Sequence, residues 1–285
     1  MWSSASGEYL PVRTIAYNRL LASGMNVLAA ARDPAKVTGM PAIAVDNDSV
    51  DSLVAAYRDA DGVFIHLPNL SEAIRVQQAK NIVLAIKTAK PKRVVVSTSG
   101  TIIDQPGTVL QAPEDSSVAI LVRGVQESGV SHAIVAPRLY LENLLLPMVF
   151  EPAENKGVLR YPVSSDLLVS WSSHLDVAEV AERLLCDHSV TGVVGVGHLP
   201  GLRGADLAVG FSEQFGRTVT FEALTPDSFG KLIEPMLGPA TVSVVGLYQI
   251  LSQATDNVID GETSAQHRLG LEPRSVRQWL AEMLG

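Results

Sequence analysis

The chain lacks several features that would commit it to particular classes of function. Its 285 residues include one cysteine, Cys186, which excludes an internal disulfide framework and a CxxC pair for zinc or redox chemistry. The 22 basic residues are outnumbered by 30 acidic ones, and the net charge of −8 argues against a nucleic-acid partner or an anionic membrane surface. No apolar run reaches the roughly 18 residues of a membrane-spanning helix, and the first residues resemble no signal peptide. We therefore expect a soluble, cytoplasmic protein.

Short catalytic motifs are also absent. The stretch Ser97-Thr98-Ser99-Gly100 lacks the first glycine of the GxSxG elbow that hydrolases use. The sequence contains no HExxH, no EF-hand loop and no GxxxxGKS/T phosphate loop, so we predict neither a metal site nor a Walker-type nucleotide site. What remains is a chain that is 47% apolar, which is enough to bury a core.

The first half of the chain alternates short apolar runs with amphipathic stretches, which is typical of strand–helix–strand units. Its apolar runs lack in/out alternation, as expected for strands that helices cover on both faces. The expected strands are Asn26 to Ala31, Ala42 to Val45, Val63 to Leu67, Arg93 to Ser97 and His132 to Ala136. The expected helices are Ser49 to Arg58, Glu72 to Thr88 and Ser116 to Ser128. The pattern predicts an α/β fold with a doubly wound, mostly parallel Rossmann-type sheet.

Beyond Pro137 the pattern is less regular and predicts a smaller, C-terminal substrate-side lobe. We expect a Rossmann-like core over residues 1–198, with 140–165 contributing to the substrate side, and an α+β lobe over 199–285. The expected helices are Glu142 to Phe150, Asp176 to Leu185 with Asp176 as its cap, Gly204 to Phe215, Pro226 to Leu237 and Thr241 to Gln253. Extended segments are expected at Val158 to Trp171, Val193 to Val196 and Thr218 to Glu222.

Open parallel sheets bind ligands beyond the carboxyl ends of their strands, so the residues that follow each strand are the candidate site. Arg32 comes directly after the first expected strand. In a dinucleotide-binding fold this position faces the adenosine ribose, where an acidic residue suits a free 2′-hydroxyl and an arginine suits the 2′-phosphate of NADP. The alternative is an ordinary solvated arginine in a turn. Asp46 and Asn47 follow the next strand and either contact adenine or start the helix at Ser49.

The order and spacing of several segments resemble the NmrA-like, atypical short-chain dehydrogenase/reductase families. The matching segments are Leu20-Leu21-Ala22-Ser23-Gly24 running into Val27–Pro34, Asp46 followed by Ser52-Leu53, Gly62–Pro68, Arg93–Ser99, Pro137 leading to Glu142-Asn143, and Leu175–Ala178. The resemblance implies an NAD(P)-binding sheet, with NADP(H) favoured by Arg32 and NAD(H) still possible. It also implies either ketone or quinone reduction or a non-catalytic redox-sensing role. On this basis His66, Leu67 and Pro68 are expected over the pyrophosphate and ribose.

The sequence departs from the family's Gly-rich turn, where backbone must approach the pyrophosphate closely at a helix N-terminus. Gly7 falls near the first glycine of the turn, but Leu10 and Arg13 occupy the later two positions. A Cβ there would crowd the phosphates, whereas the Arg13 guanidinium would pair with one of them. The preceding segment, Met1 to Ser6, is also a poor strand. These residues leave open a degenerate paralogue with impaired dinucleotide binding.

A second departure concerns proton transfer. Carbonyl reduction needs a hydride at carbon and a hydrogen-bond or proton donor at the developing oxyanion. Short-chain reductases usually supply a Tyr with a Lys four residues later, and none of the six tyrosines has that partner. Arg123 stands where related NmrA-like reductases carry a Lys, but it cannot act as an acid at neutral pH. Ser97 and Thr98 end a strand and either bond a substrate oxygen or satisfy their own backbone.

Further candidates follow Pro137, which we place against the cofactor. Tyr140 and Asn143 either line the nicotinamide and substrate pocket or, for Tyr140, belong to the core. His174 either donates a proton near neutral pH or is a solvent-facing loop histidine. The apolar stretch Leu144 to Phe150, which includes Pro147 and Met148, is a core helix, a wall of an apolar substrate pocket or a dimer face. Trp171 is a further candidate substrate contact.

Three functions remain from the sequence. The first is an NADPH-dependent reductase that acts on a bulky, largely apolar carbonyl or quinone without a Tyr-x-x-x-Lys pair. The second is a non-catalytic NAD(P)-binding sensor that regulates a partner protein, and the third is the degenerate paralogue. In the first case the partner is a small molecule, with no nucleic acid and no membrane involved, and the protein is a monomer or a homodimer.

Overall fold

The computed structural model describes residues 12–285, without the side chains of positions 12 and 13. The chain forms two compact units and passes between them several times. Among the described residues, unit 1 comprises those up to Asp104, Ala112–Ala136 and Val177–Gly195, and unit 2 comprises Gln105–Gln111, Pro137–Asp176 and Val196–Gly285. The expected segment Met1 to Ser6 lies outside the described residues.

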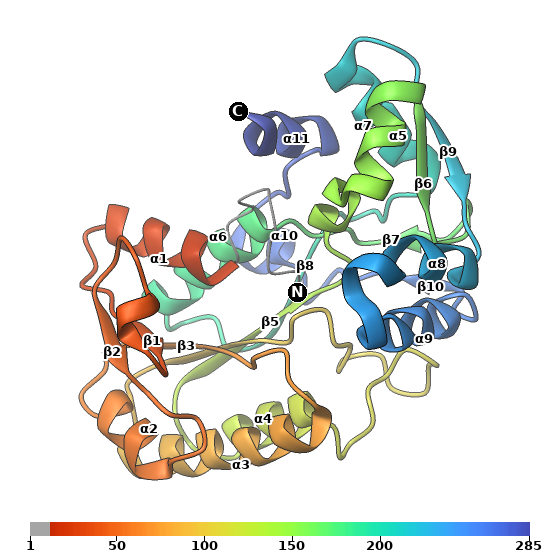
Figure 1. Ribbon diagram of the computed structural model, residues 1–285. Coiled ribbons are helices and arrows are strands. Elements are labelled where there is room, and N and C mark those ends of the chain that lie inside the picture. The colour runs from red at the N-terminus through yellow and green to blue at the C-terminus, as the bar shows by residue number, and fades with distance from the viewer. Residues whose placement is uncertain (1–11) are drawn as a thin grey trace. The chain divides into compact units, whose positions relative to one another are not determined.

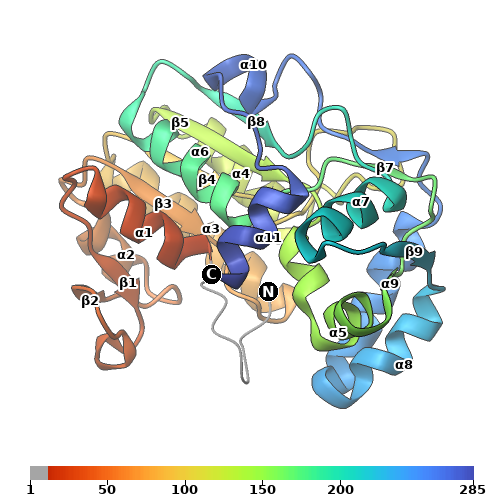
Figure 2. The same ribbon diagram turned by 90° about the horizontal axis from the view of Figure 1, so that it is seen from above.

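Unit 1 is the doubly wound, mostly parallel α/β sheet that the sequence predicts. Helices α2, α3 and α4 lie on one side of β3, β4 and β5, and α1 and α6 lie on the other (Figures 1 and 2). The elements are α1 (Val12–Ala22), β1 (Ala29–Ala31), η1 (Pro34–Lys36), β2 (Ala42–Ala44), α2 (Val50–Tyr57), β3 (Val63–His66), α3 (Glu72–Ala89), β4 (Val94–Ser97), α4 (Ser117–Gln126), β5 (His132–Pro137), α6 (His174–Cys186) and β8 (Gly192–Val196).

The sheet brings the carboxyl ends of its strands to one edge. Strands β3, β4, β5 and β8 form a four-stranded sheet in that order, and β1 pairs with β2 in a separate parallel sheet. In the parallel register His66 pairs with Ser97, so the ends of β3 and β4 are neighbours. Strand β4 is buried at every position, because the helices on both faces exclude water from it. The residues that follow β3 and β4 are therefore neighbours at this edge, and those that follow β1 and β2 lie together at the end of their own strand pair.

Local signals explain where the unit 1 helices begin and how closely they pack. The hydroxyl of Ser49 accepts a hydrogen bond from the Ser52 N–H at the start of α2, and Ser116 caps α4 in the same way. Gly124 faces α3, where a Cβ would overlap the Val83 side chain. The predicted helices and strands of this half of the chain are confirmed, although β1 is shorter than Asn26 to Ala31.

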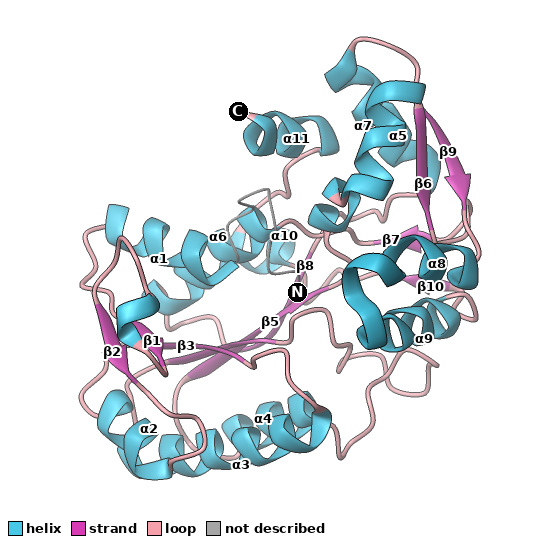
Figure 3. Cartoon of the chain, viewed as in Figure 1, coloured by secondary structure: helices cyan, strands magenta, loops and turns pink. Residues whose placement is uncertain are grey.

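Unit 2 contains short parallel strand pairs with helices packed against them. Figure 3 shows α5 and α7 beside the pair β6–β9, and β7 pairs with β10. The elements are η2 (Leu141–Leu145), α5 (Pro147–Lys156), β6 (Val158–Tyr161), β7 (Leu168–Val169), α7 (Gly204–Phe215), β9 (Thr220–Ala223), α8 (Pro226–Leu237), η3 (Gly238–Ala240), α9 (Thr241–Leu251), β10 (Asp256–Asn257), α10 (Ala265–Leu269) and α11 (Val276–Leu284).

Two predicted helix boundaries in this half of the chain are wrong. The expected helix Glu142 to Phe150 is interrupted, because Pro147 excludes the preceding residue, Leu146, from the α conformation and lets α5 begin anew. The helix expected to start at an Asp176 cap begins at His174. One of its first free amides is satisfied by Ser173, whose Oγ accepts from the Asp176 N–H at 3.0 Å. The extended stretch Val158 to Trp171 consists of two short strands, β6 and β7.

Candidate functional site

Arg32 follows β1 and faces the residues that follow β2. Its Nη2 lies 3.1 Å from Asp48 Oδ2 and 3.6 Å from Asp46 Oδ1. The Arg32 side chain is 69% exposed, and those of Asp46 and Asp48 are about half exposed. An exposed guanidinium held at the end of a parallel strand is available to an anionic ligand.

The loop after β2 is fastened to α3. The buried Gln78 donates from Nε2 to Asp48 Oδ1 at 2.9 Å, and Asn81 donates from Nδ2 to the Asn47 carbonyl at 3.0 Å. The Asp46 N–H donates to Ser52 Oγ, so α2 holds the other end of the loop. The loop that carries the carboxylates opposite Arg32 is thus held by two helices.

The ends of β3 and β4 carry hydroxyl and imidazole groups. Ser97 Oγ accepts from the Ser99 N–H, and Ser99 has a left-handed backbone with φ of 57°. Ser99 Oγ lies 3.2 Å from His66 Nδ1, which also lies 2.9 Å from the Leu67 carbonyl oxygen. Thr98 is fully buried, and no group within residues 12–285 hydrogen-bonds to its Oγ1. A buried hydroxyl without a partner is costly, so within the described residues Thr98 leaves an unused hydrogen-bonding group at this strand end.

For the other predicted cofactor residues the structure gives burial and few contacts. Gly7 lies outside the described residues, and so does the Arg13 side chain. Pro68 follows β3 and is partly exposed, whereas Pro137 ends β5 and is buried. Arg123 is exposed on α4, where its Nη1 donates to the Glu114 carbonyl at 3.4 Å.

Unit 2 brings the predicted Tyr140 and His174 together. Their rings meet edge to face with centroids 4.8 Å apart, and both side chains are partly exposed. A backbone bridge between Tyr140 and Ser172 joins the segment after β5 to the segment before α6. A phenol and an imidazole in contact are two groups able to donate a proton.

The remaining predicted substrate residues lie in apolar surroundings. Asn143 hydrogen-bonds to the buried Tyr161 hydroxyl. Trp171 is buried and packs against the Tyr161 ring with centroids 5.5 Å apart. At the start of α5, Pro147 is exposed and Met148 is partly exposed, so they are more accessible to a ligand than Trp171.

Glu142, which sequence reasoning did not single out for a role, is a buried carboxyl beside His174. Its Oε1 accepts from the His174 N–H at 2.8 Å and from Trp279 Nε1 at 3.1 Å. Within the described part of the chain, Oε2 has no hydrogen-bond partner. Burial raises the pKa of Glu142 to about 7, against the lowering effect of these hydrogen bonds. This carboxyl therefore exchanges its proton near neutral pH.

A second buried acid, Asp176, pairs with an arginine that sequence reasoning also missed. Its Oδ1 lies 2.6 Å from Arg274 Nη1, and its Oδ2 accepts from Ser173 Oγ at 2.6 Å. Burial opposes charge on Arg274, but the carboxylates of Asp176 and Glu282 raise its pKa above the usual range. These bonds tie the start of α6 to the segment before α11.

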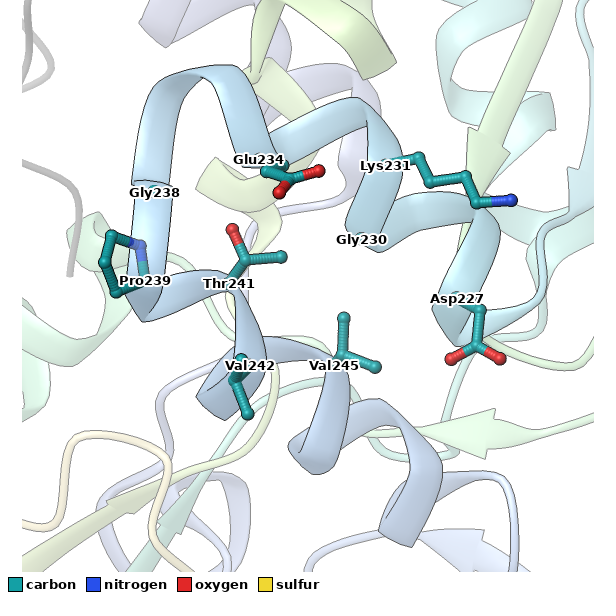
Figure 4. A pocket seen from close by; sticks show the side chains of 9 residues that line it. All are labelled: Asp227, Gly230, Lys231, Glu234, Gly238, Pro239, Thr241, Val242 and Val245. Carbon is teal, nitrogen blue, oxygen red and sulfur yellow. The ribbon is translucent and has the colours of Figure 1, made fainter.

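An open pocket in unit 2 lies apart from the predicted residues. It is formed between α8 and α9, with Asp227, Lys231 and Glu234 on one wall and Val242 and Val245 on the other (Figure 4). None of the residues predicted for catalysis or binding lines it. Across residues 12–285 no cluster of His, Cys, Asp and Glu suits a metal ion. In the same residues, no helix has the length and hydropathy needed to cross a membrane.

Known proteins resemble this chain in sequence and in fold. An NAD(P)H azoreductase from Xenophilus azovorans is 30% identical over 210 residues, which are 69% of this chain and 68% of that protein. The triphenylmethane reductase of Citrobacter sp. in complex with NADP(H) has a TM-score of 0.77 at 14% identity, covering 95% of each chain. An NADPH-dependent quinone oxidoreductase of Escherichia coli in complex with NADPH has a TM-score of 0.73 at 17% identity, covering 96% of this chain and 95% of that one.

At such low identities the two structures establish the fold alone. The family is established by sequence, since the model of the NmrA-like family matches residues 16–280. The chain belongs to the NmrA-like family.

Proposed function

We propose that the protein is an NADPH-dependent reductase of bulky, largely apolar carbonyl or quinone substrates. The observation that carries this proposal is the exposed guanidinium of Arg32 at the end of β1, fixed opposite the loop after β2. The sequence similarity to an NAD(P)H azoreductase supports a reductase of conjugated aromatic compounds. The names of the structural relatives, which refer to quinone and triphenylmethane reduction, agree with this substrate class.

The donor set of unit 1 suits a phosphorylated adenine dinucleotide. Arg32 is the proposed partner of the 2′-phosphate, since a guanidinium matches phosphate oxygens with paired N–H donors. Asp46 and Asn47 are proposed to contact adenine, and His66, Leu67, Pro68 and Pro137 to line the rest of the dinucleotide. The unpartnered Thr98 Oγ1 is a buried polar atom that such a ligand would satisfy. Gly7 and Arg13 remain proposed phosphate contacts.

A bound nicotinamide would supply the hydride, and the chain must supply the hydrogen bonds and the proton. Ser97 and Thr98 are the proposed hydrogen-bond donors of unit 1. Tyr140 and His174 are the proposed proton donors of unit 2. Asn143, Pro147, Met148 and Trp171 are the proposed substrate contacts. Arg123 is proposed to contribute positive charge without exchanging a proton.

Oxidation of NADPH by the purified protein tests this proposal. We expect loss of the reduced nicotinamide absorbance with at least one member of a panel of naphthoquinones, aromatic ketones and azo dyes. No turnover across the panel, with NADPH bound in a parallel titration, would favour the non-catalytic sensor. Failure to bind NADPH or NADH would identify a degenerate paralogue.

A substitution separates proton donation from packing once turnover is seen. Tyr140→Phe keeps the ring that contacts His174 and removes the hydroxyl, so we expect kcat to fall by about 10²-fold with KM little changed. Tyr17→Phe, a buried tyrosine of α1, is the matched control and should leave kcat near the wild-type value. An unchanged kcat in Tyr140→Phe would remove this tyrosine from the proposed proton donors.

A further inference from the structure

Arg32 does not stand alone at the end of β1, because its guanidinium is already engaged. Within residues 12–285, Arg32 contacts carboxylates through Nη2, which lies 3.1 Å from Asp48 and 3.6 Å from Asp46. Nε and Nη1 therefore remain available to a further anion. One positive and two negative charges make this cluster net negative.

Asp48 is held in its orientation by a buried neighbour. The Gln78 side chain, 1% exposed, donates to Asp48 Oδ1 and leaves Oδ2 for Arg32. The Asp48 N–H donates to Asp46 Oδ1 at 3.1 Å, so the backbone of Asp48 orients the second carboxylate. A ligand that binds Arg32 consequently lies beside these carboxylates, and displacing them would require breaking their hydrogen bonds.

We propose that Asp48 determines cofactor specificity, acting as a fixed counter-charge to Arg32 that limits the preference for NADP(H) and lets NAD(H) bind as well. This inference rests on the proposed function, because it concerns the same nucleotide site.

The two cofactors differ in a way that this cluster can discriminate. A ribose 2′-phosphate carries a charge of about −1.5 to −2 at pH 7. It gains a charge-assisted bond from Arg32 but is repelled by Asp46 and Asp48. A free ribose 2′-hydroxyl has no charge to be repelled and donates well to a carboxylate. The arginine thus favours NADP and the aspartates favour NAD.

Calorimetric titration of NADP⁺ and NAD⁺ tests the inference without any turnover. Asp48→Asn keeps the size of the side chain and removes its charge. We expect the ratio of NADP⁺ to NAD⁺ affinity to rise about three- to tenfold, and the gain to shrink as salt is added. Asp33→Asn is the matched control, because Asp33 lies in the same turn but accepts from the Ala35 N–H and pairs with Lys36. Its ratio should change by less than about twofold.

The outcomes distinguish this inference from the function on which it rests. If the wild-type protein binds neither dinucleotide, the proposed function fails and the inference fails with it. If both bind and Asp48→Asn leaves the affinity ratio within the range of Asp33→Asn, the inference alone is overturned. Asp48 is about half exposed, so the variant should fold, and an unchanged melting temperature verifies that it does. Restoring the charge in Asp48→Glu should return the ratio toward wild type.

Discussion

Each unit contains an arginine–aspartate pair, and the two pairs differ chiefly in burial. In unit 1, Arg32 and Asp48 are 3.1 Å apart with side chains 69% and 54% exposed. In unit 2, Arg274 and Asp176 are 2.6 Å apart with side chains 19% and 5% exposed. Water screens the first pair and competes for its hydrogen bonds, whereas the second pair has little access to water.

Burial decides what each pair can do. The exposed pair contributes little to stability, and its arginine has donors left for a ligand. In the buried pair the carboxylate also accepts from Ser173 Oγ and from the Arg274 N–H, and Arg274 Nε binds Glu282. The Asp176 pair therefore fixes α11 and the start of α6, whereas the Arg32 pair adjusts the charge of a binding surface.

Removing the buried carboxylate should have the largest effect. Asp176→Ala removes a carboxylate that pairs with the largely buried Arg274 charge, and it also removes the acceptor of the Ser173 hydroxyl. We expect the free energy of unfolding, measured with urea, to fall by about 3 kcal/mol. Asp166→Ala, at an exposed loop position of the same unit, should cost less than about 0.5 kcal/mol. Equal losses of unfolding free energy in the two variants would contradict a stabilising role for the buried Asp176–Arg274 pair.

Glu142 should make the stability of unit 2 depend on pH. Burial raises its pKa from 4.5 to about 7 in the folded protein, so the folded state keeps a proton that the unfolded chain has lost. The contribution is fully present below about pH 4.5 and disappears as pH rises through about 7. This contribution to the free energy of unfolding amounts to about 3 kcal/mol.

Glu142→Gln is the variant that isolates this carboxyl. It keeps the acceptor for the His174 N–H and the Trp279 indole, and should flatten the decline in unfolding free energy between pH 5 and pH 8, the range chosen for the titration. Glu154→Gln, on the exposed side of α5, should retain the wild-type slope. A slope unchanged in Glu142→Gln would assign the pH dependence to another group.

The exposed arginine should matter for binding. Arg32→Ala should weaken NADP⁺ by about 2 kcal/mol and NAD⁺ much less, because only NADP⁺ loses a charge-assisted pair. Lys36→Ala removes a positive charge from the same turn, where the lysine pairs with Asp33, and should affect the two cofactors alike. Equal losses for both cofactors in Arg32→Ala would remove the 2′-phosphate assignment.

The contrast between the units also explains which features of the molecule can be predicted from its sequence. Unit 1 is built from local signals, since an apolar run ends and a polar residue such as Arg32, Asp46 or Ser97 follows it. The sequence alone predicts these positions as candidate site residues, because the ends of parallel strands in one sheet meet at one edge. Their neighbours on α3, Gln78 and Asn81, could not be read, because a polar residue on a helix does not reveal which loop it faces.

The buried pairs of unit 2 carry no local signal. Glu142 and Trp279 are 137 positions apart, and Asp176 and Arg274 are 98 positions apart. Sequence position cannot reveal a contact that only tertiary packing creates. For Glu142 the sequence does offer one indication of a partner. It is an acid within an apolar stretch, and such a group is rarely buried without partners. The interruption of the helix at Pro147 could also have been predicted from the sequence, since the residue before a proline disfavours the α conformation.

The smallest predicted effect is the loss of unfolding free energy when the exposed Arg32–Asp48 pair is broken. Asp48→Ala breaks its contacts with Arg32 and Gln78, but water replaces the first at little cost, and the amide of Gln78 loses one acceptor. We expect the free energy of unfolding to fall by less than about 1 kcal/mol in the same urea series as Asp176→Ala. Gln78→Ala should cost more, because it empties a buried position. A loss in Asp48→Ala as large as that in Asp176→Ala would mean that burial does not separate the two pairs, and that the charges around Arg32 hold the fold together.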